Sequence, residues 1–402
     1  MNRMKEKIST ILRKKSLNLS GMLCLCLVVA LMLTGLPIGA MPTEQDGAVD
    51  LGLDCKSAIL IEASTGKVLY EQDPDKALPP ASVTKVMTLL LVMEAIEAGK
   101  IKYSDTVRAS ANACSMGGSQ IFLEENEEMS VEDLVKSVVI ASANDAAVAL
   151  AEYVAGTEEA FVKQMNEKAR ALGMKNTNFE NTNGLDDTAK NHFTSARDIA
   201  IMSRELIKYP KITEYSSIWM DSIRNGEFGL TNTNRLVRFY KGATGLKTGS
   251  TSKAGFCISA TAERDGMSLI CVIMGAPSRD VRNAAATSLL DYGFANYCIY
   301  KTEKKDFADI PVSKGCAPTV DAECSEFSAV MKKSDSGEVK MTVDLPERLT
   351  APIEKGEAVG EVIFSTGKAE LGRVEIVAKE GVDGMSFGNM ILAILGKCAL
   401  IM

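Results

Sequence analysis

Histidine and tryptophan are almost missing from this chain of 402 residues, which contains one of each. The single histidine, His192, leaves no pair of imidazoles to hold a zinc ion, and the ten cysteines form no CxxC pair. Basic residues are also in deficit, with 45 lysines and arginines against 52 aspartates and glutamates. This composition argues against a nucleic-acid partner, and we expect no metal ion and no organic cofactor.

The first 40 residues have the pattern of a secretory signal peptide. Six basic residues and one acidic residue precede an apolar run, GMLCLCLVVALMLTG, and the small residues of PIGA follow it. We therefore expect an exported protein that is cleaved after Ala40 and acts at the outer face of the cytoplasmic membrane or in the cell wall. An uncleaved membrane anchor is the alternative.

Export would permit disulfide bonds, but the cysteines give only one candidate pair. Cys316 and Cys324 could pair across a loop, and the sequence does not decide whether they do. Cys257 and Cys271 fall inside apolar segments, which is typical of small core residues.

Apolar segments and turn signals predict a mixed α/β fold of the α+β kind. Residues 57–72 have the pattern of a β-hairpin, and residues 82–98 have that of a long apolar helix ended by Gly99. A helix-rich stretch covers about 100–210, and two apolar strands follow within 254–275. Because strands stand at both ends, we expect one sheet assembled from both ends of a domain that carries a helical insert.

Changes of sequence texture divide the chain into four segments. We expect a signal peptide at 1–40, a main domain at 41–300, a small β-rich domain at 301–380 and a tail at 381–402. The β-rich assignment rests on short alternating runs such as EVKMTVDLP, which turn residues separate.

The tail ends in MSFGNMILAILGKCALIM, which carries a single charge. Its apolar residues Met390, Ile391, Ile394, Leu395 and Cys398 share one helical face, which favours a helix lying on a membrane surface. A helix packed on the β-rich domain is the alternative.

Three short motifs follow one another along the chain: Ser82-Val83-Thr84-Lys85, Ser142-Ala143-Asn144 and Lys247-Thr248-Gly249. Each is weak alone, but the first opens an apolar helix, the second interrupts a helix pair and the third begins a predicted strand. Residues three apart on a helix can touch, and a serine hydroxyl needs a neighbouring base to become a nucleophile. A desolvated lysine near another cation has a lowered pKa and can be that base. Together the motifs form the signature shared by class A β-lactamases and penicillin-binding proteins.

The chain resembles the low-molecular-weight penicillin-binding proteins that act as D-alanyl-D-alanine carboxypeptidases. Beyond the three motifs, the resemblance is carried by NTNGLDD, HFTSARDIA, TNTNRLV and GLKTGST, and it runs from about residue 50 to the tail. It implies a β-lactamase/transpeptidase-like catalytic domain followed by a β-rich domain. The implied partners are the peptidoglycan stem peptide, whose terminal D-alanine is removed, and β-lactam antibiotics, which bind covalently.

The resemblance also implies roles for individual residues. Ser82 would be acylated, Lys85 would activate it, Ser142 would relay a proton to the leaving amine, and Asn144 would bind the acyl side chain and Lys85. In the third motif, which includes Gly249, Lys247 would add positive charge and Thr248 would meet the terminal carboxylate. The backbone N–H groups of Ser82 and Ser250 would form the oxyanion hole.

Other polar residues receive structural interpretations. We expect His192 to make a local structural hydrogen bond, Asp145 to cap a helix and Trp219 to lie in the core. Arg235 is an uncertain carboxylate partner, because some relatives place an arginine where this chain has Thr233.

Two rival functions stay open at this stage. A β-lactamase of the same fold would need a glutamate that positions a water, and the nearest candidate, Glu180, lies in a turn-rich segment that favours a solvated loop. A catalytically idle cell-wall scaffold is the second rival, and three intact motifs count against it.

Overall fold

The computed structural model describes residues 49–186, 189–367, 369–388 and 391. The predicted signal peptide and most of the predicted membrane-contact tail lie outside these residues. No helix within the described part of the chain is long and apolar enough to cross a membrane.

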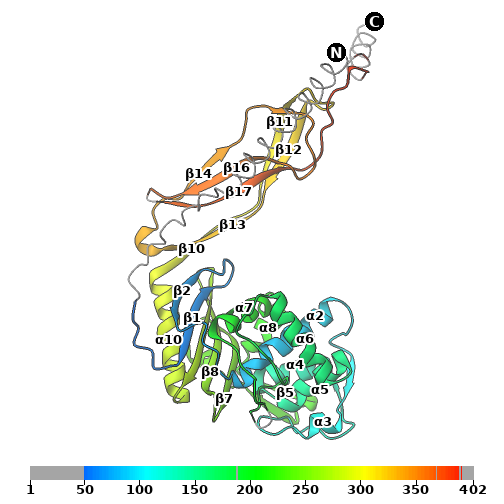
Figure 1. The fold of residues 1–402 in the computed structure, drawn as a ribbon, viewed down its shortest axis with the longest axis vertical. Coiled ribbons are helices and arrows are strands. Elements are labelled where there is room, and N and C mark those ends of the chain that lie inside the picture. Colours follow the sequence, from blue (N-terminus) through cyan, green and yellow to red (C-terminus); the bar gives the residue numbers. More distant parts are fainter. Residues whose placement is uncertain (1–48, 187–188, 368, 389–390, 392–402) are drawn as a thin grey trace, which may run out of the picture. The chain divides into compact units, whose positions relative to one another are not determined.

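A five-stranded antiparallel sheet forms the centre of the first domain, in the order β2-β1-β9-β8-β7 (Figure 1). Its strands are β1 Ser57–Glu62, β2 Val68–Gln72, β7 Ala243–Thr251, β8 Gly255–Arg264 and β9 Met267–Ala276. The N-terminal hairpin thus pairs with strands that follow it by about two hundred residues, so the predicted sheet assembled from both ends of the domain is confirmed.

Both faces of this sheet are buried. Helix α10, Arg279–Asn296, covers one face, and α7, Ala196–Leu206, lies with the other helices on the opposite face (Figure 1). Side chains of a strand alternate between the faces. On β9, Leu269, Cys271 and Ile273 join the core under α10, whereas Ile270, Val272 and Met274 join the larger core under the other helices. This double burial explains why β9 is apolar without a break from Leu269 to Met274.

The helical insert lies between β2 and β7. Its helices are η1 Ala81–Thr84, α2 Lys85–Glu97, α3 Ala111–Cys114, α4 Val131–Lys136, η2 Ser137–Ala141, α5 Asn144–Ala155, α6 Glu158–Ala171, α7, α8 Pro210–Ser216, η3 Arg224–Gly226 and α9 Leu236–Phe239. Two small antiparallel hairpins accompany them, β3 Thr106–Arg108 with β4 Glu128–Ser130, and β5 Met220–Ile223 with β6 Phe228–Thr231. Hydroxyl side chains begin several of the helices: Ser130, Thr157, Ser195 and Ser278 each accept a hydrogen bond from the N–H three residues on.

The C-terminal domain is built of strands, as predicted. They are β10 Tyr297–Thr302, β11 Lys305–Ser313, β12 Thr319–Cys324, β13 Phe327–Lys332, β14 Lys340–Asp344, β15 Leu349–Thr350, β16 Ala358–Ser365 and β17 Glu370–Ala378, with a short helix η4 Lys333–Asp335. Six of them form a sheet in the order β14-β16-β17-β12-β11-β15, and β10 pairs with β13. The rings of Phe327 and Phe364 stack with centroids 4.2 Å apart, which ties β13 to this sheet.

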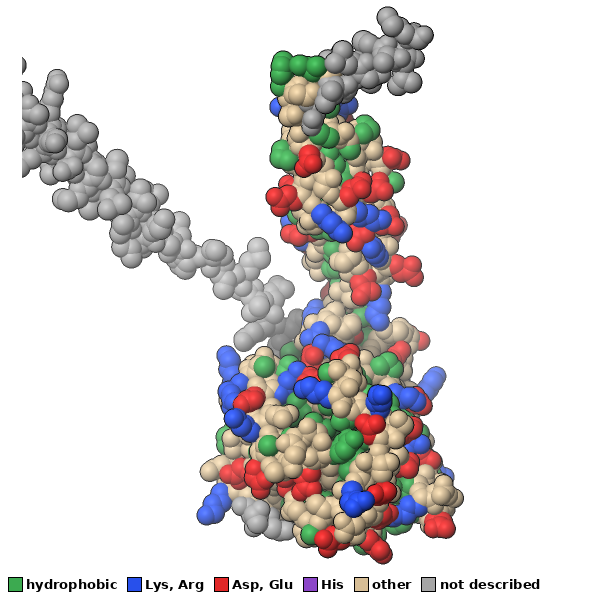
Figure 2. Space-filling model, turned by 90° about the vertical axis from the view of Figure 1, so that its right-hand side faces the viewer, with side chains coloured by type: hydrophobic (Ala, Val, Ile, Leu, Met, Phe, Trp, Pro, Cys, Tyr) green, Lys and Arg blue, Asp and Glu red, His purple; other side chains and the backbone are tan. Residues whose placement is uncertain are grey.

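No disulfide bond joins two cysteines of the described residues. Cys257 and Cys271 are fully buried in β8 and β9, where we expected core residues. The pairing that we considered for Cys316 and Cys324 does not form, since Cys316 is exposed and Cys324 is buried. At the surface, basic and acidic side chains are interspersed over the face drawn in Figure 2.

Candidate active site

Ser82 lies in a 3-10 turn, not at the start of the α-helix that we predicted. The turn η1 spans Ala81–Thr84, and α2 begins only at Lys85. Two glycines let other segments approach this turn closely. A Cβ on Gly249 of β7 would lie 2.7 Å from Ser82 N, and a Cβ on Gly184 would meet the carbonyl of Ala81. The serine is therefore held between β7 and the loop that contains Gly184.

Lys85 is fully buried one turn after Ser82, and all its polar partners belong to the site. Its Nζ lies 2.9 Å from Ser82 Oγ, 2.5 Å from Asn144 Oδ1 and 2.8 Å from the carbonyl oxygen of Asn183. Burial, followed by the charge of Lys247, holds the pKa of Lys85 well below its usual value, although Asp145 acts in the opposite direction. A neutral amine keeps two N–H donors for Asn144 and Asn183 and leaves its lone pair for the Ser82 hydroxyl.

Ser142 and Asn144 lie where the second helix pair is interrupted. A single π-helical turn, η2, precedes Ser142, whose backbone has a left-handed φ of 64°. Such turns and such backbone conformations are common at functional sites. Asn144 begins α5, and its side-chain amide donates to the carbonyl of Gly117 at 2.6 Å. Both of its polar side-chain atoms are thus engaged, one with Lys85 and one with the loop of Gly117.

Lys247 reaches the site from the sheet. We predicted that its motif begins a strand, but the motif lies inside one. Strand β7 already starts at Ala243 and pairs with β8 along its length. The buried Nζ of Lys247 donates to Ser142 Oγ at 2.7 Å and to the carbonyl of Thr248 at 2.9 Å. Burial, with a further contribution from Arg282, lowers the pKa of Lys247 to about 7. The positive charge that we expected of Lys247 is therefore reduced near neutral pH.

These residues share one cavity of about 650 Å³. Ser82, Ser142, Thr248, Gly249 and Ser250 line it, and Lys85, Asn144 and Lys247 lie behind them through the hydrogen bonds described above. All eight residues that the sequence singled out are thus brought to one place. A buried amine beside a serine hydroxyl in a polar cavity is an arrangement suited to covalent acyl transfer.

His192 and Glu180 make structural contacts and do not line the cavity. His192 Nε2 lies 2.7 Å from Thr84 Oγ1, and its Nδ1 accepts from the N–H of Glu180. Burial lowers the pKa of His192 to about 4, so the ring is neutral at physiological pH. The exposed carboxylate of Glu180 accepts from the N–H groups of Lys190 and Asn191. The interpretation of Glu180 as a solvated loop residue agrees with these contacts. The hydrogen bond of His192 is structural, as expected, but it is not local, because Thr84 belongs to a distant segment of the chain.

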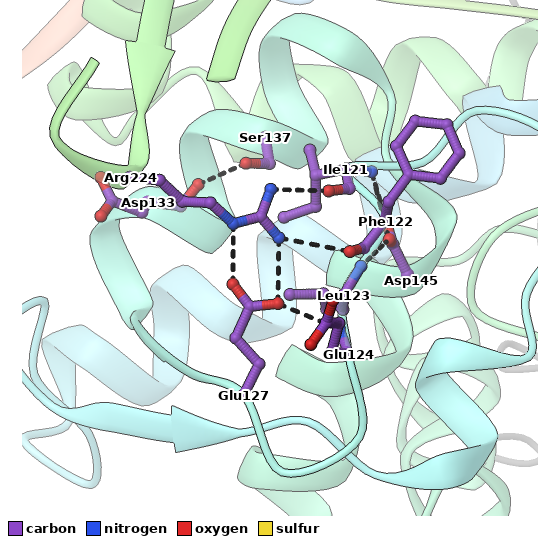
Figure 3. A network of polar contacts seen from close by, with 9 residues as sticks. All are labelled: Ile121, Phe122, Leu123, Glu124, Glu127, Asp133, Ser137, Asp145 and Arg224. Carbon is purple, nitrogen blue, oxygen red and sulfur yellow. Dashed lines mark hydrogen bonds and ion pairs between the residues drawn. The ribbon is translucent and has the colours of Figure 1, made fainter. Parts of the chain in front are cut away.

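Asp145 is not the N-cap residue of α5, although its carboxylate accepts from the first-turn N–H of Ala146 at 2.9 Å, so our interpretation is only partly right. Asp145 is buried just inside α5, and its carboxylate accepts from the N–H groups of Ile121 and Leu123 at 3.1 Å each (Figure 3). Arg224, which follows β5, holds the same loop from outside, because its guanidinium donates to the Ile121 carbonyl and makes a two-pronged ion pair with Glu127 (Figure 3). We call residues 115–127 the clamped loop.

Sequence reasoning missed several residues of the site. Asn183 supplies a backbone carbonyl to Lys85, and its only signal was its place in NTNGLDD. Ser119 lines the cavity from the clamped loop without any recognisable motif. Trp219 is half-buried and lines the cavity, so its assignment to the core was wrong. Arg279 and Arg282 also line the cavity, from the start of α10.

Comparison with known proteins agrees with this geometry. The family model described as D-alanyl-D-alanine carboxypeptidase matches residues 43–278, and the model of the penicillin-binding protein 5 C-terminal domain matches residues 298–383. The chain is 42% identical over 362 residues to D-alanyl-D-alanine carboxypeptidase DacF of Bacillus subtilis, covering 88% of this chain and 92% of that protein. It is 35% identical to DacC of Escherichia coli, covering 84% and 87%.

Solved structures show the same architecture. Penicillin-binding protein 5 from Haemophilus influenzae superposes with a TM-score of 0.73 at 32% identity, covering 84% of this chain and all of that one. Penicillin-binding protein D2 from Listeria monocytogenes, solved in its ampicillin-bound form, gives a TM-score of 0.57 at 32% identity and covers 61% of this chain. The fold that the resemblance implied is confirmed, and the chain belongs to the D-alanyl-D-alanine carboxypeptidase family of serine peptidases.

Proposed function

We propose that Ser82 is the nucleophile of this carboxypeptidase and that Lys85 is the base that activates it. The observation that carries the proposal is the buried amine of Lys85, 2.9 Å from Ser82 Oγ, with a pKa held well below its usual value. Lowering the pKa of a lysine raises the fraction of deprotonated amine that can take the hydroxyl proton, and this fraction is very small for an ordinary surface lysine.

The reaction then runs in two halves. Ser82 Oγ gives its proton to Lys85 and bonds to the carbonyl carbon of the penultimate D-alanine, while the N–H groups of Ser82 and Ser250 stabilise the oxyanion. The C–N bond to the terminal D-alanine breaks, and the proton reaches the leaving amine by way of Ser142. Water then attacks the ester, which releases the shortened stem peptide and restores the Ser82 hydroxyl.

The third motif would hold the end of the substrate. Thr248 Oγ1 lies at the cavity wall and would donate to the terminal carboxylate, and the partial charge of Lys247 would attract it. Lys247 also keeps Ser142 in place through the hydrogen bond between Nζ and Oγ. Asn144 would bind the acyl side chain as well as Lys85.

Export, membrane contact and β-lactam binding complete the proposal. The chain would act outside the cytoplasmic membrane, with the apolar tail resting on the membrane surface. β-Lactams would acylate Ser82, in line with the ampicillin-bound structure of the Listeria relative. A β-lactamase would need a water-positioning carboxylate, and Glu180 is an exposed residue already bonded to backbone N–H groups.

One experiment tests the proposed function against both rivals. The protein should release D-alanine from diacetyl-L-Lys-D-Ala-D-Ala, and fluorescent penicillin should form an adduct at Ser82 that outlasts a peptide turnover. Ser82→Ala should lose both. Rapid multiple-turnover penicillin hydrolysis without D-alanine release would identify a β-lactamase. Neither labelling nor release would indicate an idle scaffold, and full labelling of Ser82→Ala would place the nucleophile elsewhere.

A further inference from the structure

The active-site cavity continues beyond the catalytic motifs into a basic and aromatic region. Five of its lining residues, which we call the annexe, are Trp219, Arg235, Arg238, Phe239 and Arg279. Phe239 and the three arginines are exposed, and Trp219 is half-buried. Neither the proposed mechanism nor the family comparison assigns these side chains a role.

The annexe is built around the guanidinium of Arg238. Its Cζ lies 5.4 Å from the ring centroid of Trp219 and 5.5 Å from that of Phe239, and the two rings meet edge to face at 6.4 Å. Cation–π contacts hold the guanidinium but leave its N–H donors unused. Within the described part of the chain, neither Arg238 nor Arg235 nor Arg279 has a hydrogen-bonded or ion-paired carboxylate. Phe239 meanwhile exposes 73% of its surface, which is high for a large apolar ring.

The charge of the cavity is of one sign. No aspartate or glutamate is among its lining residues, whereas Arg282 joins the three arginines of the annexe there. Arg282 is buried, and its pKa is lowered to about 10, first by burial and then by the charge of Arg279. Clefts that concentrate one sign of charge attract ligands of the opposite sign.

The annexe adjoins the end of the site that would hold the substrate carboxylate. Thr248 Oγ1 donates to Thr233 Oγ1 at 2.8 Å, and Arg235 follows Thr233 by two residues. In the proposed mechanism Thr248 meets the carboxylate of the leaving residue, so groups beyond Thr233 lie on the leaving side of the scissile bond. The cavity of about 650 Å³ falls in the range of sites that take drug-sized ligands, and one alanine would occupy only a small part of it.

We propose that the annexe is a subsite for the side chain of the leaving D-residue and that it prefers a side chain carrying a second anionic group. Arg238 would donate to that group, with Arg235 and Arg279 adding positive charge and the two rings covering the aliphatic part. This inference rests on the proposed function, because it places the leaving residue at Thr248. The enzyme would then accept C-terminal D-residues larger than alanine.

The test compares peptides that differ only in charge. Diacetyl-L-Lys-D-Ala-D-Glu and its D-Gln counterpart have the same shape, and we expect kcat/KM to favour D-Glu by roughly three- to tenfold, as for one partly exposed charged hydrogen bond. Arg238→Gln should reduce this preference, measured as the ratio of the two kcat/KM values, to below about twofold. Arg170→Gln, which removes an exposed arginine from α6, is the matched control and should keep the preference. Raising the salt concentration should weaken the preference.

A binding measurement separates this inference from the proposed chemistry. Trp219 is the single tryptophan of the chain, so intrinsic fluorescence reports on the annexe. In Ser82→Ala, which should bind without cleaving, the D-Glu peptide should change the fluorescence at a lower concentration than the D-Gln peptide.

Three results would contradict the proposed subsite. The first is an equal kcat/KM for the D-Glu and D-Gln peptides, and the second is a preference for D-Glu that survives both Arg238→Gln and Arg235→Gln. The third is a fluorescence change with inorganic phosphate at the same concentration as with the D-Glu peptide. Preferential binding of the D-Glu peptide without release of any D-residue would support the subsite and contradict the proposed catalysis. Release of D-alanine without a preference for the D-Glu peptide would support the proposed catalysis and contradict the subsite.

Discussion

Burying two lysines in one site is costly for folding and useful for chemistry. Desolvating an ammonium group costs several kcal/mol unless its donors are paired, and the usual response is a lowered pKa. Both lysines are buried: Lys85 contacts Ser82 and Asn144, and Lys247 donates to Ser142. The charge of Lys247 helps to lower the pKa of Lys85, and the deprotonated Lys85 can act as the base that we propose.

The pH dependence of acylation should reveal this coupling. Lys247→Gln removes a cation whose charge lowers the pKa of Lys85, so that pKa should rise. Because the deprotonated amine is the active form, the acidic limb of the acylation rate should move to higher pH. The measurement is the rate of fluorescent penicillin labelling between about pH 5 and pH 10.

Lys241→Gln is the control, since Lys241 is exposed just before β7 and its loss changes the net charge equally. Its acidic limb should stay where it is in the parent. A limb that does not move in Lys247→Gln, or moves to lower pH, would show that Lys85 is not the titrating base.

At the scale of elements, the site depends on how closely β7 approaches the 3-10 turn of Ser82. Gly249→Ala would place a Cβ 2.7 Å from Ser82 N and 2.9 Å from Val83 N, so either the strand or the turn must shift. Because both oxyanion donors that we propose lie at this junction, acylation should fall by about a hundredfold or more, as when an oxyanion-hole donor is lost.

The same substitution at an open position gives the comparison. A Cβ on Gly229 of β6 would meet no atom within 4 Å, so Gly229→Ala should acylate like the parent. Circular dichroism should show both variants folded. If fluorescent penicillin labelled Gly249→Ala at the parental rate, the close approach of β7 to the Ser82 turn would not be needed for acylation.

The clamped loop is a second element on which the site depends. It supplies the Gly117 carbonyl to the Asn144 side chain, and Arg224 holds it through Glu127 and the Ile121 carbonyl. Arg224→Gln should lower the free energy of unfolding by about 1–3 kcal/mol, because charged hydrogen bonds in a partly buried position are lost. The acylation rate should also fall, since the loop orients Asn144.

Thermal and urea unfolding measure the first effect. Arg108→Gln is a suitable control, because the pair of Arg108 and Glu128 is exposed at 65% and 55% and should contribute at most about 1 kcal/mol. The double variant with Glu127→Gln should cost less than the sum of the single changes. Strict additivity would mean that the two side chains do not act together.

At the scale of the whole molecule, the proposed membrane contact is separate from catalysis. Deleting residues 385–402 removes the apolar tail but no residue of the active site, so the truncated enzyme should keep its activity and move from the membrane fraction to the soluble fraction. Fractionation followed by penicillin labelling measures both properties at once.

A full-length variant is needed as a control, because the truncated chain could misfold. Ile391→Asp combined with Leu395→Asp places charges on the predicted apolar face and should weaken membrane association as well. Truncated protein that still sediments with membranes would place the anchor elsewhere, with an uncleaved signal segment as the first candidate.

The sequence by itself determined the pieces of this protein that depend on local pattern. Strand alternation, hydroxyl caps such as Ser130, and the three motifs are readable because they are set by residues within a few positions of one another. The proposed nucleophile and base also belong to this class, since Ser82 and Lys85 are only three residues apart.

Only the tertiary structure decided the contacts between segments that are far apart in the chain. Asp145 binds the clamped loop as well as the first turn of its own helix, and Trp219 lies in the cavity wall instead of the core. The lowered pKa of Lys247 depends on burial among side chains that come from different parts of the sequence, among them Ser142 and Arg282. The local sequence pattern indicates which face of a helix or strand is apolar. The packing of the whole domain determines what covers that face, and therefore sets the local dielectric constant and the hydrogen-bond partners of each side chain.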